Sequence, residues 1–585
     1  MMLFILKFVI SVIALLGACV VLPQFPLGLL RFVLRSVGWA VQKRTQARRE
    51  TILARVRADE EKSRLKQPKA TSTLAPSAED EDWEKVDGSN SGDSSGPPGS
   101  PNYQQSAEAE WAGIVGFFHP FCNAGGGGER VLWEAVRATQ RQWPKAICAI
   151  YTGDIDATKE AMLERVQTRF NIQLHAPTIE LLYLTTRKYV QSSMYPYMTL
   201  LGQSLGSLVV GFDALTLLVP DIFVDTMGYA FAVAFCKLLF PSVPTGAYVH
   251  YPTISTDMLQ SLDDKTGLKG INSGAGTGLK GTLKRKYWLA FARLYGWVGS
   301  HVDVVMCNSS WTSAHIRSIW GHSRHSSPSS QAIRYKDPVV VFPPTAVSDI
   351  QSTISVSPET EKARTPTILY IAQFRPEKNH PHILRSFARF LEHHNSTATA
   401  TATKEEEPQL ILIGTVRPSS PDETHIYNLR LLAHELRIRN NTTFICDASW
   451  PSILTHLSTS SIGVNAMWNE HFGICVVEYQ AAGLIPVVHD SGGPREDIVV
   501  DLPVPGSQSQ SQSQSAEEGG NGPTGFRATS EEDFATAFEK ALSLSMEEKV
   551  AMRLRARKSA LRFTEEEFSK KWVGEVEKLV GMIQA

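Results

Sequence analysis

Four consecutive glycines, Gly125 to Gly128, separate an apolar stretch from an amphipathic one. The preceding "AGIVGFF" has the pattern of a buried strand, and the following "ERVLWEAVRATQRQW" that of a helix. Glycines lose more conformational entropy on folding than other residues and add no side-chain packing, so this position needs bare backbone. Backbone N–H groups at a helix N-terminus bind anions, which predicts a phosphate site. The spacing fits neither the dinucleotide fingerprint nor a P-loop, and a flexible turn is the alternative interpretation.

Two glutamates in "NEHFGICVVEYQAAGLIPVVHDSGGPREDI" form a second candidate site. Glu470 precedes a short predicted helix, and Glu478 lies about a turn and a half inside it. Ionised carboxylates accept hydrogen bonds from paired sugar hydroxyls. Surface helices carry many glutamates, but the Gly-Gly-Pro turn and the strand context make this pattern more specific. It predicts a site for a sugar or a ribose.

A basic loop and a histidine complete the candidates. Arg375 and Lys378, in "AQFRPEKNH", follow a predicted strand and could neutralise a diphosphate, although a solvated basic loop is the alternative. His250, in "VHYPTISTDM", ends another predicted strand, which is where doubly wound sheets place ligands. A lone histidine is more often structural, so its assignment depends on its neighbours.

The elements that must position these residues indicate an α/β protein. A chain of 585 residues is too long for one core, and strand-like runs alternate with helical stretches in two series. We expect two Rossmann-like doubly wound domains facing a cleft, at 109–345 and 346–545, followed by C-terminal helices at 546–585. Four polar inserts are expected to be loop expansions without a core role: 262–282, 322–334, 392–408 and 503–522.

The N-terminus predicts a membrane anchor. Residues 1–22 are apolar apart from Lys7 and Ser11, long enough to cross a bilayer, and we assign 1–30 to a transmembrane segment. Residues 31–108 are expected to form a basic and then disordered cytosolic linker. Its first part, 31–69, carries twelve Lys/Arg against four acidic residues, which places the rest of the chain in the cytosol. A cleaved signal peptide is the alternative, but the positive charge lies on the wrong side of the apolar segment.

Composition adds few constraints. The net charge of −1 identifies no partner, and we expect no nucleic acid. Seven cysteines without a Cys-x-x-Cys pair argue against a disulfide framework or a zinc module and favour a reducing compartment. The apolar stretch 199–221 is interrupted by Asp213 and is expected to be a core helix. For 283–299, rich in aromatic and basic residues, an interfacial helix and a packed helix with a basic start both stay open.

Several motifs together carry a family resemblance. "GFFHPFCNAGGGGERVLW", "HYPTISTDML", "QFRPEKNH" and "NEHFGICVVEYQAAG" resemble the retaining glycosyltransferases of family 4, which have the GT-B fold. The resemblance is narrowest to eukaryotic members of the endoplasmic reticulum membrane that act on dolichol-diphosphate oligosaccharides. It runs from about residue 111 to the C-terminus, apart from the inserts.

The resemblance implies an activity. It is the transfer of α-1,2-mannose, with retention, from GDP-mannose to dolichol-diphosphate-linked trimannosyl and tetramannosyl chitobiose. The catalytic domains would face the cytosol from the endoplasmic reticulum membrane, no metal or other cofactor is expected, and other mannosyltransferases of the pathway are candidate partners. Two alternatives stay open: a GT-B transferase that uses a UDP-sugar and another lipid acceptor, and a noncatalytic scaffold of the glycosylation complex.

The resemblance also implies residue roles. Lys378 would pair with the leaving diphosphate, Glu470 would contact the transferred mannose and Glu478 the ribose hydroxyls. His250 would lie near the mannose in the acceptor-side wall. The donor diphosphate and sugar would also meet the backbone of two loops, at Gly126, Gly127 and Gly128 and at His471, Phe472 and Gly473.

One position departs from the family pattern. The family has an arginine five residues before the lysine, where this chain has Gln373. Arg375 is the candidate to replace that charge.

Overall fold

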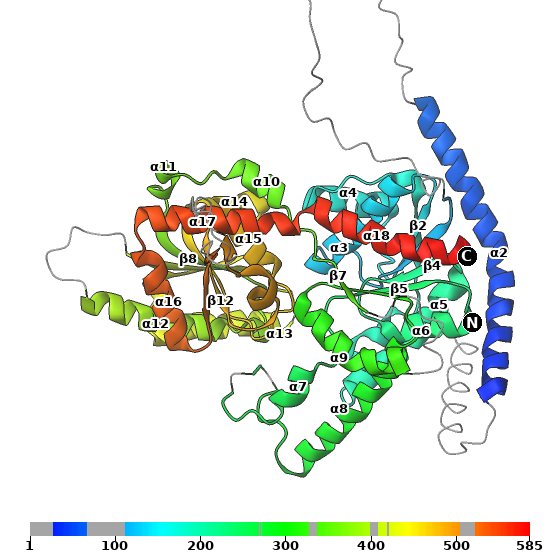
Figure 1. The fold of residues 1–585 in the computed structure, drawn as a ribbon, viewed down its shortest axis with the longest axis horizontal. Coiled ribbons are helices and arrows are strands. Elements are labelled where there is room, and N and C mark those ends of the chain that lie inside the picture. The colour runs from blue at the N-terminus through cyan, green and yellow to red at the C-terminus, as the bar shows by residue number, and fades with distance from the viewer. Residues whose placement is uncertain are drawn as a thin grey trace, which may run out of the picture.

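The computed structural model describes nine ranges of the chain: 27–66, 111–267, 269–270, 272–326, 335, 337–397, 407–417, 420–503 and 521–584. The expected anchor, apart from its last four residues, lies outside the described residues, as does the linker from 67 to 108. The described part forms two α/β domains joined side by side (Figure 1). It confirms the predicted α/β class with two parallel sheets.

The first domain contains a seven-stranded sheet in which every pair of neighbouring strands is parallel. In sheet order its strands are β3 (Ile179–Tyr183), β2 (Ile147–Thr152), β1 (Ile114–Phe118), β4 (Ile222–Asp225), β5 (Thr245–Val249), β6 (Val304–Cys307) and β7 (Val339–Val340). Its helices are α3 (Gly127–Gln142), α4 (Lys159–Phe170), α5 (Thr199–Leu217), α6 (Ala230–Leu239), α7 (Thr256–Ser261), α8 (Gly278–Gly299) and α9 (Ser310–Ser326).

The second domain contains a six-stranded sheet, in which every pair of neighbouring strands is also parallel. In sheet order they are β10 (Thr442–Cys446), β9 (Gln409–Gly414), β8 (Thr365–Ile371), β11 (Ser460–Asn465), β12 (Ile485–His489) and β15 (Phe526–Ala528). Its helices are α10 (Val347–Thr353), α11 (Pro358–Glu361), α12 (His380–Thr397), α13 (Pro421–Glu435), α14 (Trp450–Thr459), α15 (Ile474–Ala482), α16 (Glu531–Ser543) and α17 (Met546–Ala560). A small antiparallel pair, β13 (Leu502–Pro503) and β14 (Asn521–Gly522), lies beside it.

Each sheet is buried on both faces, which explains why the strands are continuously apolar in sequence. In β1, Ile114 and Phe118 belong to the core on one face, and Val115 and Phe117 to the core on the other. The alternation follows from the two-residue period of a strand.

The C-terminal helices divide between the domains. The first of them, α17, contributes Met552 to the core of the second domain. The last, α18 (Glu565–Gln584), crosses to the first domain, where Phe568 and Trp572 join its core beside α3 (Figure 1). The chain therefore closes by tying the two domains together.

The basic segment after the anchor is a helix rather than a linker. Helix α2 (Leu27–Lys66) packs against α5 and α6 through four buried side chains: Leu34, Val41, Ile52 and Val56. Arg49 pairs with Asp221 at 2.7 Å, just ahead of β4. The expectation of a linker from residue 31 is wrong as far as Lys66, because a sparse apolar stripe within a highly charged sequence is enough to dock this helix.

Helix α5 meets the length and composition of a membrane span, and half of its apolar window is buried. It packs against α6 and the turn at Arg187–Val190. Asp213, which interrupts its apolar sequence, is 1% exposed and accepts hydrogen bonds from the N–H groups of Thr185 and Thr186. In this structure α5 is a packed helix of the first domain.

Two helical glycines test how α2 is held. A Cβ at Gly38 would lie 2.3 Å from the carbonyl oxygen of Leu239, whereas a Cβ at Gly574 in α18 would meet nothing within 4 Å. Both Gly→Ala changes gain about 1 kcal/mol of helix propensity. We expect Gly574→Ala to be neutral or stabilising, and Gly38→Ala to speed amide hydrogen exchange across 27–66 in the full chain. Equal exchange in the two variants would contradict the close packing of α2 on α6.

Candidate active site

The candidate residues gather where four strands end. The glycine loop follows β1, and His250 follows β5, both in the first sheet. Lys378 follows β8, and Glu470 follows β11, which are neighbours in the second sheet. Ligands of doubly wound sheets bind at the carboxyl ends of strands. Two such edges facing each other would form a cleft between the domains.

Lys378 and Glu470 form a partly buried ion pair. The Lys378 Nζ lies 2.5 Å from Glu470 Oε2, and Asn465 Nδ2 donates to the same oxygen at 3.3 Å. Tyr370 fixes the lysine loop, because its hydroxyl donates to the Lys378 carbonyl at 2.5 Å. The loop itself is a single turn of 3-10 helix, Pro376–Lys378.

Both members of this pair are ionised. Burial alone would lower the pKa of Lys378, but the charge of Glu470 and their hydrogen bond outweigh it and raise that pKa. Burial likewise opposes ionisation of Glu470, yet the Lys378 ammonium lowers the pKa of its carboxyl overall. The site therefore holds a permanent cation whose counter-ion is the second candidate residue.

The loop after Glu470 presents free backbone donors. Within the described part of the chain, the N–H groups of His471, Phe472 and Gly473 have no hydrogen-bond acceptor. They precede α15, whose N-terminus carries partial positive charge. Gly473 has φ +102°, and a Cβ at Gly492 would lie 2.3 Å from the Glu470 carbonyl oxygen, so the Gly-Gly-Pro turn packs directly beneath this loop. The arrangement suits an anion or a sugar oxygen.

The glycine loop is organised by a glutamate that the sequence reasoning missed. The Glu129 carboxylate accepts from the N–H groups of Ala124, Gly125 and Gly126. Gly126 is therefore already satisfied, and among the described residues Gly127 and Gly128 keep unpartnered N–H groups. The signal that could have found Glu129 is its place at the third helical position after the loop, where glutamate reaches back to cap.

Close approach explains the remaining glycines. A Cβ at Gly127 would lie 2.8 Å from Ile474 Cδ1 in the second domain. A Cβ at Gly128 would lie 3.7 Å from the ring of His250. The bare backbone at the start of α3 thus meets α15 of the other domain on one side and the candidate histidine on the other.

His250 is a neutral, oriented side chain. Its Nε2 bonds to the carbonyl oxygen of Thr226 at 2.9 Å, so this nitrogen carries the proton. Burial lowers the pKa of His250 to about 4. His119 bonds to the Thr226 hydroxyl at 2.9 Å, and its pKa falls to about 3, chiefly by burial. The structure thus places His250 beside the glycine loop with Nδ1 as an acceptor.

Glu478 differs from Glu470 in lacking, among the described residues, a cation paired with its carboxyl. Burial raises its pKa to about 7, and the nearby charge of Arg130 only partly offsets this. No hydrogen bond or ion pair of the described residues involves Glu478. Glu478 lies on α15, C-terminal to Glu470, as expected. Its carboxylate accepts no hydrogen bond from the described residues.

Arg375 is joined to Lys378 through the backbone, where the Lys378 N–H donates to the Arg375 carbonyl at 3.1 Å, and no side-chain contact of the described residues links the two. Its Nε is buried without a hydrogen-bond partner among the described residues, and its charge helps to lower the pKa of Asp422 after the larger effect of Arg417. Among the described residues, its link to Gln373 is a backbone hydrogen bond, in which the Arg375 N–H donates to the Gln373 carbonyl at 2.8 Å. Replacement of the family arginine by Arg375 stays a prediction without support from these contacts.

The two domains also touch through polar and aromatic groups around the cleft that the sequence reasoning missed. Asp257 of α7 accepts from Asn469 Nδ2 at 2.7 Å and from Trp311 Nε1 at 3.2 Å. The ring of His471 stacks on Tyr251 with centroids 5.2 Å apart. Tyr251 directly follows His250 and Asn469 directly precedes Glu470, so adjacency to the strand-end candidates was the available signal.

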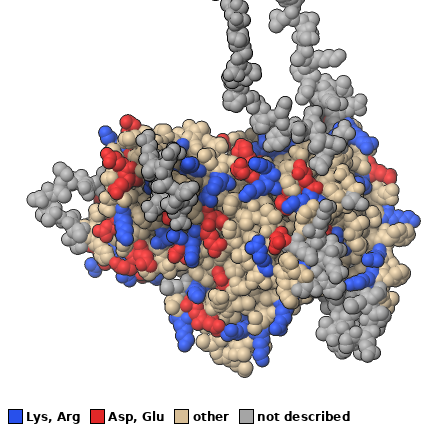
Figure 2. Space-filling model, in the orientation of Figure 1, with Lys and Arg blue, Asp and Glu red and all other residues tan. Residues whose placement is uncertain are grey.

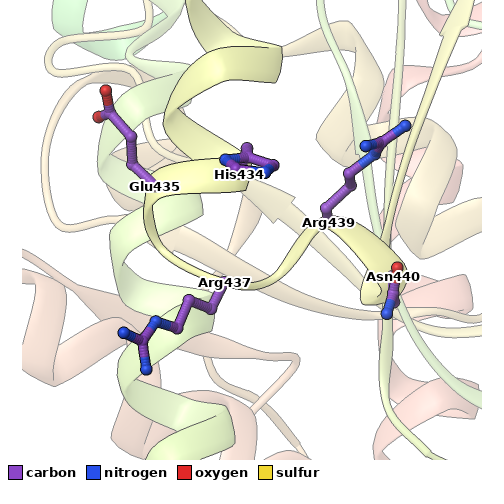
Figure 3. Close-up of a pocket in the computed structure, with 5 residues that line it drawn as sticks. All are labelled: His434, Glu435, Arg437, Arg439 and Asn440. Carbon is purple, nitrogen blue, oxygen red and sulfur yellow. The ribbon is translucent and has the colours of Figure 1, made fainter.

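A cavity of about 530 Å³ on the second domain is lined by none of the candidate residues. Its lining is His434, Glu435, Arg437, Arg439 and Asn440. Figure 3 shows these side chains pointing away from one another rather than toward a common point.

The comparisons with known proteins agree over both domains. The family model described as "ALG11 mannosyltransferase N-terminus" matches residues 112–320, and that described as "Glycosyl transferases group 1" matches 353–559. A Neurospora crassa protein named GDP-Man:Man(3)GlcNAc(2)-PP-Dol alpha-1,2-mannosyltransferase is 52% identical over 94% of this chain and 93% of its own length. The Homo sapiens protein of that name is 40% identical over 80% and 87%.

Solved structures share the fold at low identity. An alpha,alpha-trehalose 6-phosphate synthase from Burkholderia multivorans has a TM-score of 0.55 at 12% identity, covering 80% of this chain and 99% of that one. A sucrose-phosphate synthase from Thermosynechococcus elongatus has a TM-score of 0.53 at the same identity, covering 80% and 99%. The fold is GT-B. The chain belongs to the family of GDP-Man:Man(3)GlcNAc(2)-PP-Dol alpha-1,2-mannosyltransferases.

Proposed function

We propose that this chain transfers mannose from GDP-mannose, in α-1,2 linkage and with retention, to dolichol-diphosphate-linked trimannosyl and tetramannosyl chitobiose. Its relatives of that name match both domains and the chain is a glycosyltransferase of their family. The observation that carries the proposal is the partly buried Lys378–Glu470 pair, which lies beside free backbone donors at the strand ends.

Each group has a task in this reaction. Breaking the sugar–diphosphate bond develops negative charge on the leaving oxygen, and preorganised cationic and N–H donors stabilise that charge. Lys378 supplies the cation, and the N–H groups of Gly127 and Gly128 supply further donors. Glu470, held by Lys378 and Asn465, is placed to accept hydrogen bonds from mannose hydroxyls. We include in the proposal that no metal ion takes part.

The same proposal covers location. We propose that residues 1–30 anchor the chain in the endoplasmic reticulum membrane and that both domains face the cytosol. The basic content of α2, immediately after the apolar segment, supports this orientation. Other mannosyltransferases of the pathway are proposed partners.

The direct test is transfer from radiolabelled GDP-mannose to a trimannosyl chitobiosyl diphosphate lipid, with EDTA present and UDP-sugars in parallel. We expect GDP-mannose-dependent extension by α-1,2-linked residues. Lys378→Gln should lower the rate about a hundred- to thousandfold, because one transition-state donor is lost. Transfer from a UDP-sugar instead would favour the other GT-B alternative, and no transfer by a folded chain would favour a scaffold.

The Lys378 variant needs a folding control. Removing one partner of a buried ion pair typically costs about 3–5 kcal/mol, because the other charge is left uncompensated. The double variant Lys378→Gln with Glu470→Gln removes both charges and should fold while staying inactive. Lys540→Gln, at an exposed position of α16, should match the natural chain. Near-normal turnover in a folded Lys378→Gln chain would overturn the assignment.

The raised pKa of Glu478 predicts that binding of the donor depends on pH. Its pKa of about 7 in the free protein means that the carboxylate able to accept two ribose hydroxyls forms only as the pH rises through 7. GDP-mannose should therefore bind about tenfold more tightly at pH 8 than at pH 6, following the ionised fraction. The diphosphate diester of GDP-mannose does not titrate in this range. His250 and His471 do not either, because their pKa values lie at about 4.

The measurement is calorimetric titration of GDP-mannose at the two pH values. Glu478→Gln should bind more weakly at pH 8 and lose most of the dependence. An unchanged tenfold dependence in that variant would show that another group is responsible.

N-glycosylation sequons, Asn-x-Ser/Thr, provide a test of orientation. Asn308, Asn440 and Asn441 begin such sequons and have described side chains: Asn308 and Asn441 are buried, and Asn440 is exposed. Asn440 is therefore the informative acceptor. We expect the natural chain, expressed in a eukaryotic cell, to carry no glycan there by mass spectrometry. A version directed into the lumen by a cleaved signal peptide is the positive control, and a glycan at Asn440 in the natural chain would contradict the cytosolic orientation.

A further inference from the structure

Helix α8 carries an exposed stripe that its packing does not explain. Leu279, Leu283 and Trp297 are 88%, 68% and 44% exposed, and Lys286 and Arg293 are exposed between them. Their spacings of four, three, seven and four residues keep them on one side of the helix. The stripe alternates apolar and cationic side chains over a helix of 22 residues, or about 33 Å.

The opposite side of α8 belongs to the core. Trp288, Phe291 and Tyr295 are buried, and the helix packs against α6 and α9. Trp288 is only 6% exposed, so it is a packing residue and not a surface aromatic. The packed-helix interpretation is confirmed for this side of α8, and the interfacial interpretation of the exposed side stays a prediction.

Exposed apolar side chains also occur at the start of α2. Phe32 and Trp39 there are 68% and 66% exposed, and Leu29 is 47% exposed. Burial has the largest effect in lowering the pKa of His301, just after α8, and the charge of Arg31 in α2 contributes to this lowering. The ring of His301 in turn lies 4.7 Å from that of Trp297.

The other end of the stripe borders a hollow. A cavity of about 560 Å³ lies between the start of α5 and α8, lined in part by Met198, Leu200, Leu283 and Tyr287, with Lys280 and Lys284. Tyr197 beside it is 87% exposed. Figure 1 shows α8 projecting from the first domain, and Figure 2 shows lysine and arginine side chains on that projecting part, beside an acidic group.

We propose that the stripe of α8, the first turns of α2 and residues 197–198, together the docking face, rest on an anionic lipid bilayer. Aromatic and aliphatic side chains interleaved with Lys and Arg are what an interfacial helix presents to lipid headgroups. Long basic side chains can lay their stems on the apolar layer and keep the charge at the phosphates. The apolar residues 1–22, the proposed anchor, precede α2 closely in the sequence, so the proposed anchor and this face belong to neighbouring parts of the chain.

The docking face also borders the route to the cleft. A Cβ at Gly270, in the loop between α7 and α8, would lie 2.9 Å from the ring of Trp468, two residues before Glu470. The loop belongs to the insert 262–282, which was expected to have no core role, and its Gly270 approaches Trp468 of the second domain. If the acceptor is lipid-linked, as the proposed function holds, contact of the face with the bilayer keeps the acceptor diphosphate near the site.

The test uses the full chain in vesicles. A cysteine at Leu283→Cys, in a Cys19→Ser, Cys446→Ser background, carries a fluorophore quenched by doxyl-labelled lipid. Leu554→Cys, at a 48% exposed leucine of α17 in the second domain, is the matched control. We expect at least threefold more quenching at position 283 than at 554, more with phosphatidylserine than with phosphatidylcholine alone, and less in high salt.

Equal quenching at the two positions would overturn the proposal, and would be the outcome if the face binds a protein instead. The readout needs no enzymatic activity, so it stands apart from the proposed function. In a second measurement, Leu283→Glu with Trp297→Glu should raise KM for a long-chain lipid acceptor in vesicles about tenfold. It should leave kcat/KM for a soluble short-chain acceptor within twofold, as should Leu554→Glu for both acceptors. Equal losses on both acceptors would indicate a structural defect and count against docking.

Discussion

The candidate site depends on one demanding interaction, the pairing of Lys378 with Glu470, whose side chains are only 20% and 12% exposed. Withdrawing two charges even partly from water costs free energy, and the cost is recovered only with good geometry and additional hydrogen bonds. Asn465 provides one such bond to Glu470, and the Tyr370 hydroxyl holds the loop of Lys378. A pair maintained at that cost in a cleft is better explained by chemistry than by stability.

The pairing also requires unusual backbone. Asn379 and Asn469, each next to one member of the pair, have φ of +53° and +52°. Asparagine tolerates this left-handed region better than most residues. Gly492 at φ +65° lies against the backbone of residues 469 and 470 and leaves no room for a side chain. The local strain and the buried charges thus occur at the same few positions, as is common at functional sites.

The sequence predicted the fold and the individual candidates because both depend on local patterns. Apolar runs of strand length gave the two sheets, and residues following those runs gave His250, Lys378 and Glu470. The partnership of Lys378 with Glu470 was not predictable from spacing, since 92 residues separate them and the contact depends on β8 pairing with β11. Sheet order is a property of the whole domain.

Other features are equally hard to predict. The role of Arg375 near the leaving group stays a prediction, because the direction of a long side chain is set by packing that the sequence does not display. Helix α2 was read as a linker because its charged residues dominate the composition, whereas docking depends on a few apolar positions and on Gly38, which lies against the Leu239 carbonyl.

Burial finally decides which charges the site offers. It keeps His250 and His471 neutral and holds Glu478 near the midpoint of its titration at neutral pH. Lys378 and Glu470 are both ionised and offset each other's charge. Under the proposed function, the unpartnered backbone N–H groups of Gly127, Gly128 and the loop before α15 add donors to the Lys378 ammonium for a diphosphate. Fixed dipoles need no reorganisation as charge moves to the leaving group, and this is the chemical reason that the proposed function gives for the glycines of the first loop.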